Sequence, residues 1–208
     1  MRSLQRLGGT MLVAVCTMAV PAVVAAQGSG CGSQWTMPAV GSWAEWQGKD
    51  GKSRVALVGK EEKDGKTLYR LEMASAKGTM QMVVPAFPFQ MDQVVEMVLQ
   101  QTGQPPMKMS GQTLAMIHVP ASGMADLARK CASMKVVGQE SITVPAGTFP
   151  TTHLKNADGD EVWASTTVPF TMVKYTGKDG ESVLSGTGAD AKTAIVGTPT
   201  EMPGMPRN

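Results

Sequence analysis

The sequence has few of the side chains that support catalysis or hold metals. It contains two histidines, His118 and His153, and three cysteines among 208 residues. It has no Gly-x-Ser-x-Gly elbow for a nucleophilic serine, and no Cys-x-x-Cys or His-x-x-x-His pair for zinc. Many of its aspartates adjoin glycine, where turn geometry accounts for them. We therefore expect a protein that is not an enzyme and needs no cofactor.

An excess of charge of one sign is also missing. The chain has 19 Lys and Arg against 17 Asp and Glu, whereas a nucleic-acid-binding protein needs a clustered basic face. Aromatic residues make up 5% of the chain, but the hydrophobic fraction of 42% is sufficient for one core and argues against disorder. The composition predicts a globular protein with no nucleic-acid partner.

The N-terminal segment has the pattern of a secretory signal peptide. Arg2 and Arg6 precede an uncharged, largely apolar stretch that closes on Val24-Ala25-Ala26, and cleavage is expected after Ala26. The remaining chain then has equal numbers of basic and acidic residues and no membrane-spanning segment. We expect a periplasmic protein, with secretion or lipid anchoring as alternatives. The expected division is a signal peptide at 1–26, a lead segment at 27–42, one β-rich domain at 43–197 and a flexible tail at 198–208.

Two cysteines, Cys31 and Cys131, follow the expected cleavage site. An even pair in an oxidising compartment predicts a disulfide bond. By restricting the unfolded chain, a bridge closing a loop of roughly 100 residues would stabilise the protein by about 4–5 kcal/mol. A lipidated Cys31 and a free thiol at Cys131 are the alternatives.

Asp-Gly pairs recur at Asp50, Asp64, Asp158 and Asp179, between runs that alternate or are β-branched. Asp-Gly tolerates the backbone of tight hairpins, so the sequence predicts a mainly antiparallel sheet. One helix is expected over residues 122–134, residues 92–101 fit either a helix or a strand, and residues 114–119 resemble a strand. The other expected strands cover residues 43–47, 53–60, 67–73, 79–84, 136–144, 151–155, 161–165, 172–175, 182–184 and 193–196.

Methionine is unusually frequent, with 17 residues in the chain. Thioethers fill irregular cores, line adaptable apolar pockets and bind Cu(I), so three roles are open. Met80 and Met82 alternate with polar residues along one expected strand. The candidate residues for binding a hydrophobic ligand are Trp43, Met80, Met82, Met97 and Trp163. The candidate copper ligands are Met107, Met109, Met116 and His118.

Several motifs in the second half of the chain carry a family resemblance. They are Val137-Gly138-Gln139-Glu140, the run from Val144-Pro145 to Phe149, Trp163 and Val168-Pro169-Phe170. With these motifs the chain resembles exported bacterial proteins of unassigned function (DUF4412/DUF3108-like), which are distantly similar to LolA/LolB-type lipoprotein carriers.

The resemblance implies an α+β, mainly β fold: a strongly curved antiparallel sheet, or half-barrel, whose concave face is closed by one or two helices. Together with the alternating methionine-rich strands, it leads us to expect a periplasmic protein that binds a lipid, an acyl chain or a lipidated partner. We also expect a monomer. The alternatives are a structural or interaction protein of the envelope without a small ligand, and a Cu(I)-binding protein.

Overall fold

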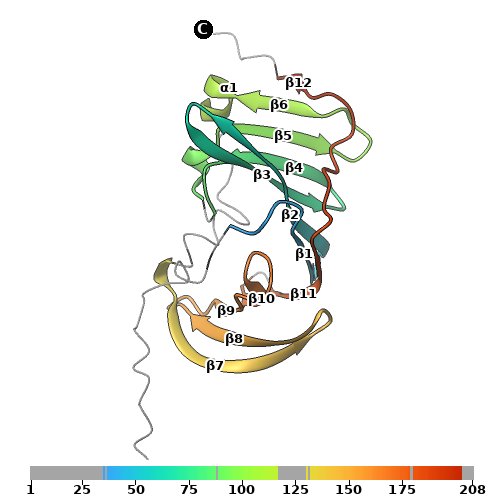
Figure 1. Ribbon diagram of the computed structural model, residues 1–208. Helices are drawn as coiled ribbons and strands as arrows, with labels where there is room; N and C mark the ends of the chain where they lie inside the picture. The colour runs from blue at the N-terminus through green and yellow to red at the C-terminus, as the bar shows by residue number, and fades with distance from the viewer. Residues whose placement is uncertain are drawn as a thin grey trace, which may run out of the picture.

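The alternating runs and their Asp-Gly turns form one large open sheet in the computed structural model, which describes residues 35, 37–87, 89–116, 130, 132–178 and 180–202 (Figure 1). The predicted mainly antiparallel β architecture is confirmed. The twelve strands are β1 (Trp43–Gly48), β2 (Gly51–Lys63), β3 (Lys66–Ser75), β4 (Gly78–Val84), β5 (Glu96–Gln101), β6 (Met107–Ser110), β7 (Lys135–Val144), β8 (Gly147–Lys155), β9 (Glu161–Ala164), β10 (Met172–Gly177), β11 (Gly180–Gly188) and β12 (Thr200–Glu201).

Two meanders build the sheet. Strands β1 to β6 follow one another in space, as do β7 to β11, and the pairing of β1 with β11 joins the two halves. The turns form where Asp-Gly pairs predicted them, and Asp64 and Gly65 between β2 and β3 both have positive φ, at 52° and 72°. All of these neighbours are antiparallel, and the two-residue β12 adds to β6 in parallel. At the other end of the sheet, β7 pairs only with β8 among the described strands.

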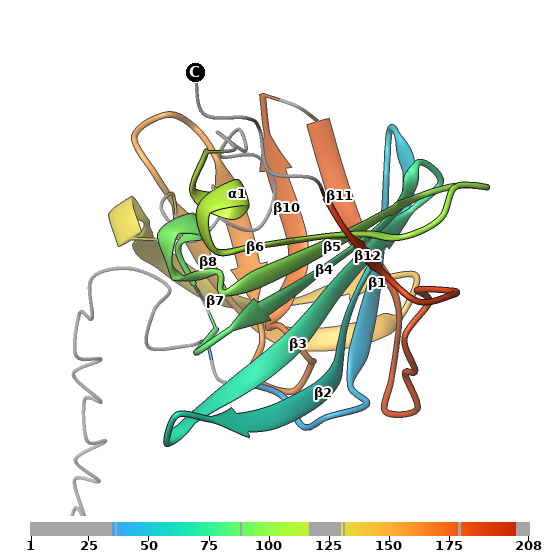
Figure 2. The same cartoon turned by 90° about the horizontal axis from the view of Figure 1, so that it is seen from above.

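The sheet curves, so that β2 to β6 and β7 to β10 lie in different layers when seen from above (Figure 2). One continuous core lies against the face that carries Leu57, Leu71 and Leu154, which we call the inner face. Loop aromatics contribute to this core. Trp35 stacks on Phe87 with ring centroids 5.1 Å apart, and Phe87 meets the edge of Phe170 at 5.5 Å. The centre of the inner face is therefore filled by the protein's own side chains.

Phe170 enters this core from the loop between β9 and β10. Phe170 and Thr171 have positive φ angles of 59° and 57°, which bulky and β-branched side chains rarely adopt. The backbone bonds from Ser165 N–H to the Thr171 carbonyl and from Thr171 N–H to the Val168 carbonyl hold the loop inward. The Val168-Pro169-Phe170 motif thus delivers a fully buried aromatic ring to the core.

Short helical segments replace part of what the sequence predicts. Residues 92–101 form the end of a 3-10 turn, η2 (Met91–Gln93), followed by β5, so the strand alternative is confirmed there. The strand expected at 114–119 is wrong at its start, because Gly111 with φ +52° ends β6 and begins the helix α1 (Gly111–Met116). Of the helix expected at 122–134, the described residues 130, 132 and 133 are helical.

Other predictions lie outside the described residues. These are the signal peptide, the Cys31–Cys131 disulfide, His118 and most of the covering helix. Within the described ranges no helix is long and apolar enough to cross a membrane.

Residues 189–199 cross the outer face of the sheet between β11 and β12 as an irregular segment, which we call the strap. The strand predicted at 193–196 is wrong, because the strap bonds mainly to side chains of the sheet rather than to a neighbouring strand. The Ala194 N–H donates to the Glu72 Oε1 at 2.9 Å, and the Val196 N–H donates to the Gln100 Oε1 at 2.8 Å.

Candidate ligand-binding site

Two parallel rows of apolar side chains cross β3 to β6 on the inner face. In the first, directly opposed partners give the order Met73, Met80, Leu99, Met107. We call these four residues the rim row. In the second, two positions along each strand, the order is Leu71, Met82, Met97, Met109, which we call the core row. Side chains two residues apart on a strand share a face, so both rows belong to one surface.

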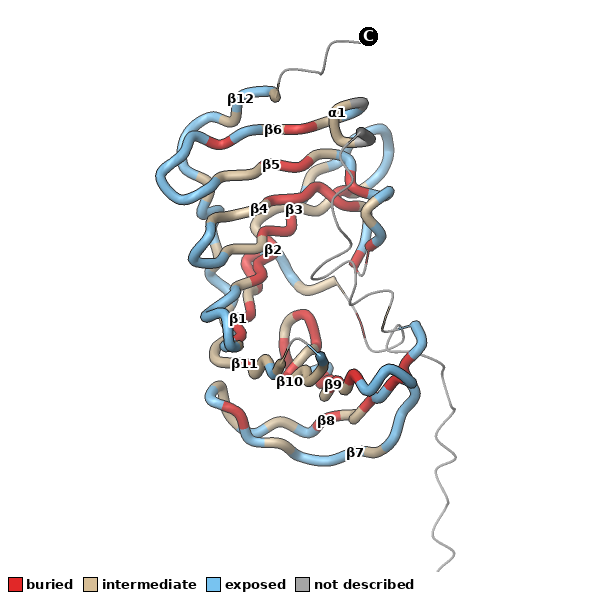
Figure 3. The backbone as a smooth tube through the Cα atoms, turned by 180° about the vertical axis from the view of Figure 1, so that it is seen from behind, coloured by how far each residue is buried: buried red, intermediate tan, exposed pale blue. Residues whose placement is uncertain are grey.

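The two rows differ in exposure. All four members of the core row have at most 1% of their surface exposed. The tube in Figure 3 shows buried segments within β3 to β6. In the rim row, Met73, Met80 and Leu99 are half-buried and Met107 is 42% exposed. The core row is therefore part of the closed interior, and the rim row is accessible.

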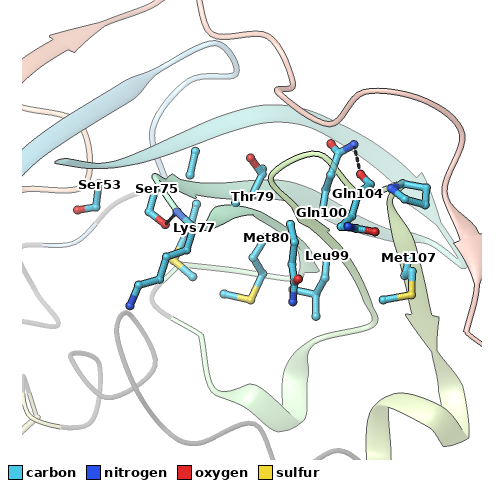
Figure 4. Close-up of a pocket in the computed structure, with 14 residues that line it drawn as sticks. Ser53, Ser75, Lys77, Thr79, Met80, Leu99, Gln100, Gln104 and Met107 are labelled. Atoms are coloured by element: carbon cyan, nitrogen blue, oxygen red, sulfur yellow. Dashed lines mark hydrogen bonds between the residues drawn. The ribbon is translucent and has the colours of Figure 1, made fainter. Parts of the chain in front are cut away.

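A cavity of about 570 Å³ lies over the rim row. Its apolar wall includes all four rim-row residues, and Ser75, Lys77 and Gln104 contribute polar groups around it. Figure 4 shows Met80, Leu99 and Met107 extending to one side of the sheet, with Lys77 on that same side. The volume falls within the range of about 300–1,000 Å³ usual for small-molecule sites.

Backbone geometry at the start of β4 sets the shape of this cavity. Gly78 has φ +141°, and a Cβ there would overlap the carbonyl oxygen of Gln100 on β5. Only glycine lets β4 approach β5 so closely at this end. The close approach brings the Met80 side chain beside that of Leu99, its direct partner on β5.

Met80 lines this cavity, whereas Met82 and Met97, two further predicted ligand-binding residues, lie in the core row. No sequence pattern pointed to Met73, Leu99 or Lys77 as residues of this site. Strand alternation placed Met73 on the same strand face as Leu71, but only the pairing register shows that it faces Met80.

Trp43 lies on the outer face, away from this cavity. Its indole N–H donates to the Asp190 Oδ1 at 2.8 Å, and the Arg54 guanidinium lies 4.4 Å from the ring centroid. A Cβ at Gly188 would overlap the indole, so this glycine makes room for the ring. Trp43 thus attaches the strap to the sheet, while Trp46 is buried and donates to the Met172 carbonyl at 2.9 Å.

Trp163 also lies apart from the cavity. It stacks on His153 with ring centroids 4.2 Å apart, and its indole N–H donates to the Glu140 Oε1 at 2.7 Å. The Nε2 atom of the His153 imidazole lies 2.9 Å from the Glu161 Oε2. Hydrogen bonds from Lys155 and then from His153 lower the pKa of Glu161. The structure therefore does not bring the five predicted ligand-binding residues together.

The copper candidates are divided between the two rows. Met107 is in the exposed rim row and Met109 is buried in the core row, although both project from the same face of β6. The Met116 side chain and His118 lie outside the described residues. Across the described ranges, no group of three or more His, Cys, Asp or Glu side chains is arranged to hold a metal ion.

Comparisons with known proteins give little similarity. No family model matches the chain, and no curated protein matches it. A Bacteroides fragilis structure described as an exported protein with a YmcC-like fold aligns with a TM-score of 0.36 and 11% identity, covering 74% of this chain and 99% of that one. A Parabacteroides distasonis structure described as a lipoprotein aligns with a TM-score of 0.30 and 11% identity, covering 74% of this chain and 97% of that one.

Scores this low support no argument about fold or function. The LolA/LolB resemblance is not shown by these comparisons, and it stays a prediction from the sequence motifs.

Proposed function

We propose that this is an exported, non-enzymatic protein that binds a hydrophobic ligand with an extended hydrocarbon chain in the cavity over the rim row. The observation that carries the proposal is the division between the two methionine-rich rows. The core row is closed, whereas Met73, Met80, Leu99 and Met107 line an open cavity of about 570 Å³. The N-terminal signal-peptide pattern supports export.

The chemistry of the wall favours an apolar, variable ligand. Methionine side chains are unbranched and polarisable, so they can repack around ligands of different shape. When a ligand removes these partly exposed apolar side chains from water, the binding free energy becomes more favourable by about 25 cal/mol for each Å² of apolar surface buried. The rim row can therefore bind apolar ligands of different shapes without close steric complementarity.

The polar groups of the cavity favour binding over catalysis. The described residues that line it include no His, Cys, Asp or Glu, and its hydroxyl groups belong to Ser53, Ser75 and Thr79. A hydroxyl nucleophile needs a neighbouring base, and the lining supplies none among those residue types. This composition supports a site that holds its ligand unchanged.

The proposal is tested by titrating delipidated protein with 1-dodecanol, a neutral single-chain probe, in a calorimeter. We expect saturable binding with one site per chain. Leu99→Gln puts a polar group into the cavity wall and is expected to weaken binding about five- to tenfold.

Val196→Gln is the matched control, because Val196 is 74% exposed and does not line the cavity. Its affinity for 1-dodecanol should equal that of the wild type. Thermal unfolding of both variants checks that the fold is retained. Non-saturable uptake by the wild type, or equal affinity of Leu99→Gln and wild type, would contradict the proposal.

A further inference from the structure

The cavity over the rim row continues into a polar groove. This groove has a volume of about 360 Å³ and shares Ser53, Ser75 and Lys77 with the cavity. The turn between β1 and β2 and the start of β11 form its other walls. Lys77, in the turn between β3 and β4, therefore stands where the apolar and polar compartments meet.

Five charged residues line this groove, and two of them are already in ion pairs. Lys49, Lys52 and Lys77 line the groove with Asp50 and Glu181. The Lys52 ammonium pairs with Glu45 at 2.8 Å, and Glu181 pairs with Lys174 at 2.6 Å.

Lys77 and Lys49 have no such pairing. Neither forms an ion pair with another of the described residues. The Lys49 stem lies over Gly180, on the far side of the groove from the rim row. Of these two lysines, Lys77 is the one beside the rim row, four residues after Met73 and three before Met80.

We propose that the ligand is a fatty acid, with its carboxylate at the Lys77 ammonium and its hydrocarbon chain along the rim row. This inference rests on the proposed function and specifies its substrate class. The rim row crosses three inter-strand spacings of about 4.8 Å, so it offers a track of about 14 Å leading away from Lys77. Charge at one end and apolar surface along the rest match a single-chain amphiphile.

The head group that fits is a carboxylate rather than a phosphate. Phosphate sites usually use the planar fork of arginine or several converging backbone N–H groups. The described residues that line the cavity and the groove include no arginine, and their cationic side chains are Lys49, Lys52 and Lys77. A lysine ammonium acts as a point charge, which suits a monoanion.

The test compares laurate with 1-dodecanol, which has the same chain length and a neutral head, on wild type and Lys77→Gln. For laurate, Lys77→Gln should weaken binding by up to about fivefold, the range of an exposed ion pair. For 1-dodecanol the affinity should not change. Added salt should weaken laurate binding to the wild type and leave binding to Lys77→Gln nearly constant.

Lys66→Gln is the matched control. Lys66 is also an exposed lysine at a hairpin turn, but it lies at the opposite end of β3, about 30 Å from Lys77 along the strand. Its laurate affinity should equal that of the wild type. Dodecyl phosphate provides a further arm, and we expect it to bind no more tightly than laurate.

The outcomes separate this inference from the proposed function. If neither laurate nor 1-dodecanol binds the wild type, the proposed function fails. If both bind and Lys77→Gln weakens neither, or weakens both equally, the assignment of a carboxylate at Lys77 is overturned while the hydrophobic site stands. Tighter binding of dodecyl phosphate, lost in Lys77→Gln, would replace the carboxylate with a phosphate.

Discussion

Met73 on β3 and Met80 on β4 are direct cross-strand partners, and both remain half-exposed, whereas the next inner-face pair, Leu71 and Met82, is buried. The pairing of β3 with β4 therefore creates two neighbouring surfaces, one buried and one accessible to solvent. The buried pair secures the sheet to the core, and the half-exposed pair begins the wall of the cavity. Substitutions in the two rows should affect different properties.

The first prediction separates stability from binding in the two rows. Met82→Ala should lower the free energy of unfolding by about 2–5 kcal/mol, because it leaves a cavity in a closed core. Met80→Ala should lower it by about 1 kcal/mol or less, because water already reaches this side chain. Urea denaturation measures both values. Equal losses in the two variants would mean that the rim row belongs to the core.

The same residues show how far the sequence alone leads. Alternation and Asp-Gly turns predicted the hairpins, because both are local signals that strand geometry and turn backbone impose. Register between strands is not local. Leu99 meets Met80 only because β4 and β5 pair in one particular alignment after a connection of eleven residues. The sequence therefore identified Met80 as a candidate but not its neighbours.

The positions of the tryptophans were harder still to predict. Trp43 binds Asp190, 147 residues further along the chain, and fits over Gly188. Neither contact leaves a pattern near Trp43 in the sequence. Three residues later, Trp46 faces the interior, which agrees with the two-residue repeat of a strand. The two-residue repeat predicts that Trp43 and Trp46 lie on opposite faces of β1, but it does not predict that the strap covers the outer face.

The second prediction concerns the strap. Glu72 is 3% exposed and accepts hydrogen bonds from Gln81, from the Thr193 hydroxyl at 2.7 Å and from the Ala194 N–H at 2.9 Å. Glu72→Gln replaces one accepting oxygen with an amide NH2 group, which cannot accept a hydrogen bond from the donor that points at it, so it should lower the free energy of unfolding by about 1–3 kcal/mol.

Hydrogen exchange at the Ala194 amide is the direct measurement, and it should accelerate in Glu72→Gln. Limited proteolysis should also cut the strap faster. Glu62→Gln is the control, since Glu62 is exposed and, within the described part of the chain, its side chain bonds only the nearby Thr67 hydroxyl. Unchanged exchange at Ala194 in Glu72→Gln would show that the carboxylate does not hold the strap.

The third prediction uses two glycines of extended strands. A Cβ at Gly177 would overlap the Tyr175 hydroxyl and the Asp160 Oδ1, whereas a Cβ at Gly138 would meet no atom of the described residues within 4 Å beyond its own chain neighbours. Gly177→Ala should therefore lower the free energy of unfolding by about 1–3 kcal/mol, as overpacking does. Gly138→Ala should be neutral or slightly stabilising, because alanine restricts the unfolded chain. Thermal and urea unfolding of the pair would test this, and equal stabilities would contradict the predicted overlap.

The last prediction is the pH dependence of the Asp160 carboxylate, whose side chain is 4% exposed. Burial raises its pKa, but hydrogen bonds from Tyr175, Asn156 and Lys130 outweigh burial and leave the pKa below its ordinary value. The Tyr175 hydroxyl donates to Oδ1 at 2.8 Å, and the Lys130 ammonium lies 3.2 Å from Oδ2. The folded state therefore holds this proton less tightly than the unfolded chain does.

The sign of the effect follows from that difference. Asp160 contributes stability above the unfolded pKa of about 3.9, and this contribution is lost as pH falls through the lower folded pKa. Urea unfolding at pH 7 should find Asp160→Asn less stable than wild type by about 1–3 kcal/mol, and the gap should narrow steadily below pH 4. Asp158→Asn is the control, because Asp158 lies at an exposed position of the same turn, and it should change the free energy of unfolding at pH 7 by about 0.5 kcal/mol or less. A gap for Asp160→Asn that stays constant from pH 7 into the acid range would mean that the ionised carboxylate is not what stabilises this turn.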